Sequence, residues 1–397
     1  MGRTLHVVGA GLAGLSAAVQ LTQAGEAVVV HEAAGQAGGR CRSYHDPALD
    51  MEIDNGNHLL LSANHASLDF LRIIGADRLD GPQHADFPFV DLKTGERWTL
   101  KIGDGRLPLW IFDKQRRVPG TRPADYLALA RLLLPPRDAA VADVIACRGL
   151  LYDRLVGPLL LAALNTAPAE GSAALAAAVL RETVAVGGRA CRPLIARDGL
   201  GPTFVAPALD HRARRGARVG FGRRLRAIAF AERRAAALDF GDETVRLGDD
   251  DRVILAVPPV VAAALLPRLT APTEFRAIVN AHFRLAPPAG MPPIIGVING
   301  TVEWIFAFAD RLSVTISGAD RLVDTPRDSL AKAIWDEVAT VARIGNRDAP
   351  PRWQIVRERR ATFAALPTEE RKRPGATTEW SNLWLAGDWT ATGLPAT

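Results

Sequence analysis

Apolar positions at the start of the chain change from continuous runs to helical spacing and back to runs. Residues 4–8 (TLHVV) and 27–31 (AVVVH) are short apolar runs of the kind found in buried parallel strands. Between them, residues 12–24 place small side chains where a helix packs against a sheet. The pattern therefore predicts a βαβ unit of about thirty residues.

The later pattern predicts further α/β structure. Residues 80–190 read as mostly helical, with apolar clusters separated by prolines. Residues 277–317 alternate like antiparallel strands, and a helix is expected near 328–343. Further strands are predicted at 218–220, 227–230, 235–240, 252–257, 353–359 and 383–386. We expect a two-domain α/β protein.

Composition narrows the class of protein. The chain has 397 residues, 48% of them hydrophobic, and a formal net charge of +5, which excludes disorder, collagen and coiled coil and gives little reason to expect a nucleic-acid partner. Its three cysteines (Cys41, Cys147, Cys191) are far apart, so neither a disulfide scaffold nor a zinc ribbon is expected, and no metal site is predicted. With no signal peptide evident and no apolar run of about 18 residues, we expect a cytoplasmic protein, in solution or on the inner face of the membrane.

A glycine motif lies between the first strand and the helix. Gly9, Gly11 and Gly14 form GxGxxG, in which Gly9 permits a tight turn and Gly11 allows the backbone to approach a pyrophosphate. Gly14 lets the helix lie close to the sheet, and the helix N-terminus faces the phosphate. Glu32 ends the second strand, where a carboxylate accepts from ribose hydroxyls. Together these residues predict a dinucleotide site.

Two further elements extend this site. In the segment 35–40, just after Glu32, Gly38 and Gly39 expose backbone donors and Arg40 offers a forked guanidinium to the same pyrophosphate. Far along the chain, a predicted strand ends in Gly387-Asp388, which would bring a carboxylate to the ribityl chain of a flavin. The three elements in this order favour FAD over NAD.

The order GxGxxG, Glu, GGR and GD resembles the amine oxidase and phytoene desaturase superfamily of flavoproteins. Within it, residues 54–61 (DNGNHLLL) and 383–397 (LWLAGDWTATGLPAT) look like the hydroxysqualene dehydroxylase family of bacterial hopanoid and squalene biosynthesis. Residues 356–363 (VRERRATF) are similar to that family's approach to the terminal motif. A glutamate-bearing helix after Thr397 is also expected on this resemblance.

The resemblance implies a discontinuous Rossmann-like FAD-binding domain, like that of amine oxidases and glutathione reductase, with a second α+β substrate domain. We expect the FAD-binding domain to comprise 1–80, 191–265 and 366–397, and the substrate domain to comprise 81–190 (mostly helical) and 266–365 (antiparallel sheet plus helix). Residues expected at the cofactor are Gly9, Gly11, Leu12, Ala13, Gly14, Glu32, Ala33, Gly38, Gly39, Arg40, Gly56, Asn57, Val219, Gly387, Asp388, Leu394, Pro395 and Ala396. No cysteine lies near the carboxyl terminus, where covalent amine oxidases hold theirs, so non-covalent FAD is expected.

The implied reaction is reductive removal of the allylic hydroxyl of hydroxysqualene, with hydride from reduced flavin N5. His58, or in second place Asp54, is the hypothetical proton donor. The residues around Asp54 equally fit a turn, since an Asn-Gly step is a common hairpin signal. No second GxGxxG is present, so the electrons would come from an external donor.

Three alternatives stay open. An oxidative carotenoid or polyprenyl desaturase and an amine oxidase share the fold and cofactor, and a prenyl-lipid carrier would keep the fold without redox chemistry. A long apolar isoprenoid substrate would need an apolar cavity. Peripheral contact with a membrane is also possible through seven arginines, which a solvated surface explains equally well: Arg212, Arg214, Arg215, Arg218, Arg223, Arg224 and Arg226.

Overall fold

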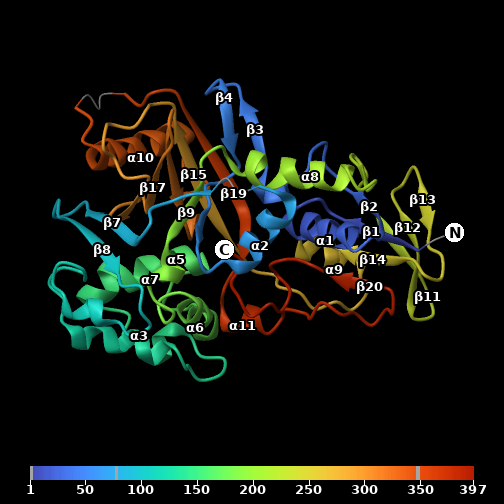
Figure 1. The fold of residues 1–397 in the computed structure, drawn as a ribbon, viewed down its shortest axis with the longest axis horizontal. Coiled ribbons are helices and arrows are strands. Elements are labelled where there is room, and N and C mark those ends of the chain that lie inside the picture. Colours follow the sequence, from blue (N-terminus) through green and yellow to red (C-terminus); the bar gives the residue numbers. More distant parts are fainter. Residues whose placement is uncertain (1–2, 77–78, 346–348) are drawn as a thin grey trace.

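A computed structural model describes residues 3–76, 79–345 and 349–397. The predicted segments 1–80 and 266–365 therefore include a few residues outside this description. In Figure 1 a parallel sheet lies on the right, a large antiparallel sheet on the upper left, and a group of helices beneath that sheet. None of the helices in the described ranges combines the length and apolarity needed to cross a bilayer.

Three distant parts of the chain form the parallel sheet. Its strands are β1 (Thr4–Val8), β2 (Ala27–His31), β10 (Arg218–Gly220), β14 (Arg252–Leu255) and β20 (Leu383–Leu385). They are hydrogen-bonded in the order β10-β2-β1-β14-β20, with every pair parallel. Helices α1 (Leu12–Gln23) and α8 (Ala206–Ala213) contact each other beside this sheet. The beginning, middle and end of the sequence thus share one sheet.

The antiparallel sheet has seven strands in the order β19-β15-β18-β17-β16-β7-β8. One pair departs from the antiparallel pattern, because β16 and β7 run parallel. Helix α10 (Arg327–Ala342) packs on one face, where apolar side chains of helix and sheet form a single core cluster. The strands are β7 (Ala85–Asp91), β8 (Arg97–Ile102), β15 (Phe275–Phe283), β16 (Ile294–Ile298), β17 (Trp304–Ala307), β18 (Leu312–Ile316) and β19 (Trp353–Phe363).

Helices beneath this sheet make up the cap, the name used below for residues 103–191. They are α3 (Leu127–Leu132), α4 (Val141–Val144), α5 (Gly157–Leu164), α6 (Ala173–Glu182) and α7 (Gly188–Cys191). Short sheets complete the fold: β3 (Ser43–Asp46) with β4 (Met51–Asp54); β5 (Leu59–Leu61) and β6 (Leu79–Asp80) with β9 (Pro193–Ala196); and β11 (Ala227–Ala231), β12 (Arg234–Asp239) and β13 (Thr244–Arg246). The remaining helices used below are α2 (His65–Ile74), α9 (Pro259–Leu265) and α11 (Pro367–Glu370).

Most predicted elements are confirmed, but the helical expectation for 80–190 is wrong at its beginning. Residues Ala85–Asp91 and Arg97–Ile102 form the hairpin β7–β8, which joins the edge of the antiparallel sheet. Alternate side chains of this hairpin, including Phe89, Trp98 and Leu100, are buried. Burial of every second side chain is the local signal for strands. It was overlooked because the apolar clusters that follow have helical spacing.

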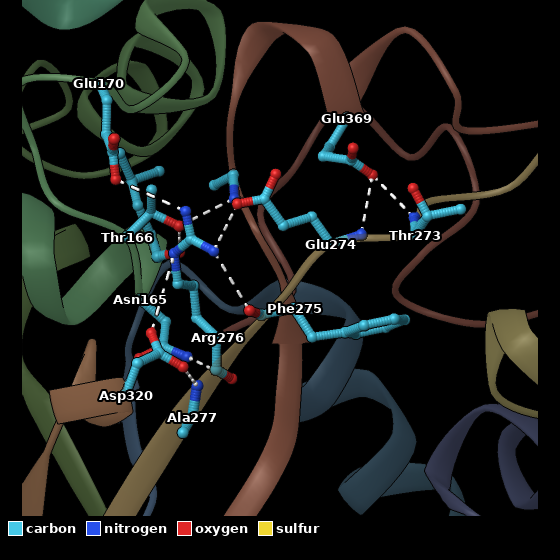
Figure 2. A network of polar contacts seen from close by, with 12 residues as sticks. Asn165, Thr166, Glu170, Thr273, Glu274, Phe275, Arg276, Ala277, Asp320 and Glu369 are labelled. Carbon is cyan, nitrogen blue, oxygen red and sulfur yellow. Dashed lines mark hydrogen bonds and ion pairs between the residues drawn. The ribbon is translucent and has the colours of Figure 1, made fainter. Parts of the chain in front are cut away.

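A polar network joins the cap, strand β15 of the antiparallel sheet and Glu369 of α11, which accepts from Thr273 N (Figure 2). The guanidinium of Arg276 on β15 contacts three carboxylates: Glu274 at 2.7 Å, Glu170 of the cap at 3.6 Å and Asp320 at 3.9 Å. Beside it, the cap's Asn165 donates through Nδ2 to the Arg276 carbonyl at 3.3 Å. One arginine side chain therefore connects elements from three separate stretches of sequence.

Two buried histidines lie side by side in the parallel sheet. His6 Nδ1 and His31 Nε2 are 3.1 Å apart, and burial together with His6 and Arg223 lowers the pKa of His31 to about 3. Between pH 6.5 and about 3 the unfolded chain binds a proton that folded His31 does not. We therefore expect the free energy of unfolding to be highest above pH 6.5. Below pH 6.5 this group should lower it by up to about 1.4 kcal/mol for each pH unit. Thermal unfolding between pH 7 and 4 measures it.

His31→Gln keeps a hydrogen-bonding side chain beside His6 but carries no proton. Its melting temperature is expected to depend less steeply on pH, whatever its value at pH 7. His45→Gln is the matched control, because the His45 side chain is 61% exposed. Equal slopes in the wild type and His31→Gln would contradict the assignment.

Candidate active site

The glycine loop between β1 and α1 is tightly packed at two positions and open at a third. A Cβ on Gly9 would lie 2.3 Å from the Ala256 carbonyl oxygen, and one on Gly14 would lie 1.9 Å from the Gly9 oxygen. Gly9 also has a φ of +104°, which favours glycine. A Cβ on Gly11 meets nothing within 4 Å. The loop therefore requires glycine at Gly9 and Gly14, and it presents Gly11 to open space.

This open space lies at a positive helix end. The N-terminus of α1 has no side-chain cap and no acidic residue in its first turn, and Leu12 and Ala13 are half-buried. The next glycine loop lies against it, since Gly38 N donates to the Ala10 carbonyl at 2.8 Å. A Cβ on Gly39 would approach Gly11 Cα to 3.2 Å. Two glycine loops beside the N-terminus of a helix that no side chain caps fit a pyrophosphate.

Glu32 and Val219 lie at neighbouring strand ends. The Glu32 carboxylate accepts from Ala10 N at 2.7 Å and from Ala34 N at 2.8 Å, which fixes it beside the glycine loop. Val219 on β10 pairs with Val30, two residues before Glu32. Ala33 is exposed at the same edge. The fixed carboxylate keeps unused lone pairs that fit ribose hydroxyls.

The predicted cofactor groups Arg40 and Asp388 pair with each other. Arg40 Nη2 lies 2.7 Å from Asp388 Oδ1, and Nη1 donates to the Ala361 carbonyl at the end of β19. Asp388 raises the pKa of Arg40 against the effect of burial, so the guanidinium stays charged. The sequence analysis predicted that both groups bind the cofactor, and it did not predict that they pair with each other. The pair joins the first loop to the last strand.

Two residues that sequence reasoning missed hold the terminal turn. The buried guanidinium of Arg373 donates to the carbonyls of Asp388 (3.1 Å) and Thr390 (2.9 Å). Trp389 Nε1 donates to the Val257 carbonyl at 2.8 Å, after β14. The sequence carried no evident signal for Arg373, whereas Trp389 adjoins the GD motif. The Trp389 contact fixes the turn relative to the glycine loop, since Val257 lies beside Gly9, and the Arg373 contacts hold the turn itself.

The last residues run back toward the cap. Ala396 packs against the large core cluster, and Thr397 Oγ1 donates to the Ala163 carbonyl of α5. Leu394 is exposed and Pro395 is half-buried. The predicted cofactor residues Leu394, Pro395 and Ala396 therefore lie between the Asp388 turn and α5.

Residues 54–57 connect the β3–β4 hairpin to the antiparallel sheet. Asp54 accepts from Ser43 Oγ at 2.5 Å and from Leu200 N at 2.9 Å, while burial raises its pKa. Asn57 Nδ2 donates to the Val314 carbonyl and to Thr315 Oγ1, both at 3.2 Å. Both partners lie on β18, so Asn57 is held by the antiparallel sheet. 

The Asn55-Gly56 step is not a hairpin turn. Strand β4 before it pairs with β3, while β5 after it pairs with β9. A Cβ on Gly56 would lie 3.0 Å from Asn280 Nδ2 on β15. The step therefore brings the chain close to β15 of the antiparallel sheet, where a larger residue would press on Asn280.

His58 has the only accessible surface among the predicted proton donors. Its Nδ1 lies 3.0 Å from the Gly56 carbonyl, which can only accept, so Nδ1 carries the hydrogen and Nε2 has a free lone pair. Desolvation by the surrounding protein lowers the pKa of His58 although the residue keeps accessible surface, and the Gly56 carbonyl and the Asp54 charge only partly oppose this. The imidazole is therefore neutral at pH 7.

Apolar side chains gather around Leu59, the residue after His58. Leu59 and Trp304 pack against a cluster of Ile195, Ile294, Phe306 and Phe308, which come from β9, β16, β17 and the residue after β17. The accessible imidazole of His58 therefore adjoins, along the chain, a residue of an aromatic and aliphatic cluster. Such a boundary suits an apolar ligand with one polar group.

Comparison with known proteins identifies the family. The family model for flavin-containing amine oxidoreductases matches residues 12–397. Hydroxysqualene dehydroxylase from Rhodopseudomonas palustris is 59% identical across all of this chain and 95% of the relative, and its counterpart from Zymomonas mobilis is 47% identical across 99% and 94%.

Solved structures share the fold at low identity. An oxidoreductase from Methanosarcina mazei superposes with a TM-score of 0.73 at 16% identity, covering 98% of this chain and 95% of that one. Cyclohexylamine oxidase from Brevibacterium oxydans gives 0.71 at 16% identity, covering 99% and 95%. The predicted α/β flavoprotein fold is thereby confirmed, and the chain belongs to the flavin-containing amine oxidoreductase family.

Proposed function

We propose that this flavin-dependent oxidoreductase reductively dehydroxylates hydroxysqualene to squalene. The observation that carries the proposal is full-length similarity to hydroxysqualene dehydroxylases, with identity reaching 59%. In this reaction a C–O bond is replaced by a C–H bond, two electrons and two protons are consumed, and water leaves. The electrons come from a separate two-electron donor.

FAD is the cofactor that fits the site best. Gly11 and the N-terminus of α1 would hold the pyrophosphate, Glu32 the ribose and Asp388 the ribityl chain. The chemistry that reduced FAD supplies when bound is hydride donation. Burial raises the pKa of Cys41 in the cofactor loop to about 12, so its thiol stays protonated and is a poor nucleophile. This supports non-covalent binding.

The chain's own residues have two tasks in this reaction. The cluster around Phe306 and Trp304 would hold the isoprenoid chain and exclude water from the reacting carbon. His58, at its polar boundary, would protonate the leaving hydroxyl through Nε2. Because that nitrogen is unprotonated at pH 7, the productive form of His58 is its cation.

This assignment sets the direction of a pH profile. The His58 cation forms as pH falls through a pKa below the usual 6.5, so turnover of the prereduced enzyme should rise from pH 8 toward pH 5.5. His58→Gln should lower turnover by about a hundredfold and flatten the profile. Unchanged turnover in His58→Gln would remove His58 from the mechanism and leave Asp54 as the second candidate.

A single experiment tests the function. The flavin is reduced without oxygen, hydroxysqualene is added in detergent, and flavin absorbance and lipid products are followed. We expect stoichiometric flavin reoxidation with squalene formed. No reoxidation with hydroxysqualene, but flavin reduction by a polyene or peroxide release with an amine, would favour a desaturase or an amine oxidase. A colourless protein unable to take up FAD would favour a lipid carrier.

A further inference from the structure

The cap carries a concentration of exposed apolar side chains. Five large ones lie within residues 107–134, each more than half exposed: Leu107 (72%), Leu109 (67%), Phe112 (66%), Leu127 (64%) and Leu134 (85%). We call these five residues the cap patch. Elsewhere in the described ranges, exposed large apolar side chains do not exceed 43% exposure. Such a group is unusual on a surface that meets only water.

Buried contacts hold the two halves of the cap patch together. Trp110, between Leu109 and Phe112, packs its ring against Tyr126 with centroids 5.4 Å apart. Tyr126 directly precedes Leu127, and its hydroxyl accepts from Val118 N at 3.0 Å. The two rings are inside the cap, and the flanking leucines and phenylalanine point outward. The loop and α3 therefore belong to one packed unit, and α3 lies at the opposite end of the molecule from the parallel sheet (Figure 1).

The surroundings of the patch are basic. Residues 101–150 contain nine Lys and Arg against five Asp and Glu, a net charge of +4 out of +5 for the whole chain. Five of these basic side chains are exposed near the patch in sequence: Arg106, Lys114, Arg122, Arg131 and Arg137. Apolar side chains surrounded by cations match an anionic bilayer surface, which offers both acyl chains and negative headgroups.

The arginine segment that the sequence suggested for lipid contact is less suitable. Arg212 is buried, at 2% exposure, and its guanidinium donates to the Arg218 carbonyl. Arg223 pairs with Glu243 at 2.5 Å. The segment exposes one large apolar side chain, Phe221. The arginine segment therefore lacks the cap's combination of several exposed apolar side chains with exposed cations.

We propose that the cap patch docks this protein onto the surface of an anionic lipid bilayer. The proposal rests on the proposed function, because a substrate as apolar as hydroxysqualene resides in membranes. Leu107, Leu109 and Phe112 insert at the boundary between headgroups and acyl chains, and the surrounding cations contact the headgroups. The cap then faces the compartment that holds the substrate.

Vesicle sedimentation tests the proposal without using activity. Flavin-loaded full-length protein is mixed with vesicles of phosphatidylcholine containing 30% phosphatidylglycerol, and with phosphatidylcholine alone. We expect binding to the anionic vesicles that weakens with added salt. The triple variant Leu107→Ser/Leu109→Ser/Phe112→Ser should bind at least tenfold less tightly, at an unchanged melting temperature. Val260→Ser/Val261→Ser on α9 is the matched control and should bind like the wild type.

A second variant separates charge from apolar contact. Arg106→Glu/Lys114→Glu/Arg131→Glu retains the cap patch and should lose the preference for anionic vesicles. Equal binding of the triple serine variant and the wild type would overturn the proposal. The proposal would also be overturned if the wild type did not bind vesicles but self-associated, and if the serine substitutions abolished that self-association. The cap patch would then join two copies of the chain. Vesicle binding without dehydroxylation in the anaerobic assay would contradict the proposed function and still support the docking surface.

Discussion

Gly11→Glu is expected to yield a folded protein that purifies without flavin. A Cβ at Gly11 meets no protein atom within 4 Å, so a side chain there begins in open space. It places a carboxylate at the α1 N-terminus, where a pyrophosphate would lie, and like charges at this range repel strongly. We expect at least a hundredfold weaker FAD binding, which corresponds to about 3 kcal/mol.

Flavin absorbance after purification and titration of the apoprotein with FAD measure this effect. Gly105→Glu is the matched control, because a Cβ there also meets nothing within 4 Å and the residue lies in the cap. The two variants should melt at similar temperatures in the absence of FAD. Normal flavin content in Gly11→Glu would show that FAD does not bind at this helix end.

Arg276→Leu is expected to loosen the cap from the antiparallel sheet. The Arg276 side chain is 17% exposed, and its removal leaves Glu170, Glu274 and Asp320 close together without a cation (Figure 2). Those carboxylates are about half exposed, so water offsets part of the loss. We expect a destabilisation of about 2 kcal/mol. The cap should also be cleaved faster by a protease.

Arg268→Leu serves as the control for this variant. Arg268 pairs with Glu379 at 2.8 Å, but its side chain is 81% exposed, so its loss should cost less than about 0.5 kcal/mol. Thermal unfolding and limited proteolysis compare the two variants. Equal stability of both would mean that the Arg276 network contributes no more than a surface ion pair.

Local sequence signals were sufficient for the parallel sheet. Thr4–Val8 and Ala27–His31 are strands at the predicted residues, because apolar β-branched runs next to glycine turns have few other buried conformations. Helix α10 lies within one residue of its predicted bounds at each end. The positions of Gly9, Gly14 and Glu32 in the site follow from the same local motif.

Long-range pairings could not be predicted in this way. Arg40 and Asp388 are 348 residues apart, and each looked like a cofactor ligand because its motif gave no information about the other. The placement of Asn57 against β18 depends on how two sheets meet, and β18 has no local signal for that. The buried role of Arg373 was likewise invisible, since arginine is ordinarily exposed.

The strand order of the parallel sheet also bears on synthesis in the cell. Strand β14 has β1 on one side and β20 on the other, and β14 ends at Leu255 whereas β20 begins only at Leu383. During translation, this edge of β14 therefore stays uncovered until the intervening residues and β20 itself have left the ribosome. The nascent chain must keep its exposed edge from aggregating for that time.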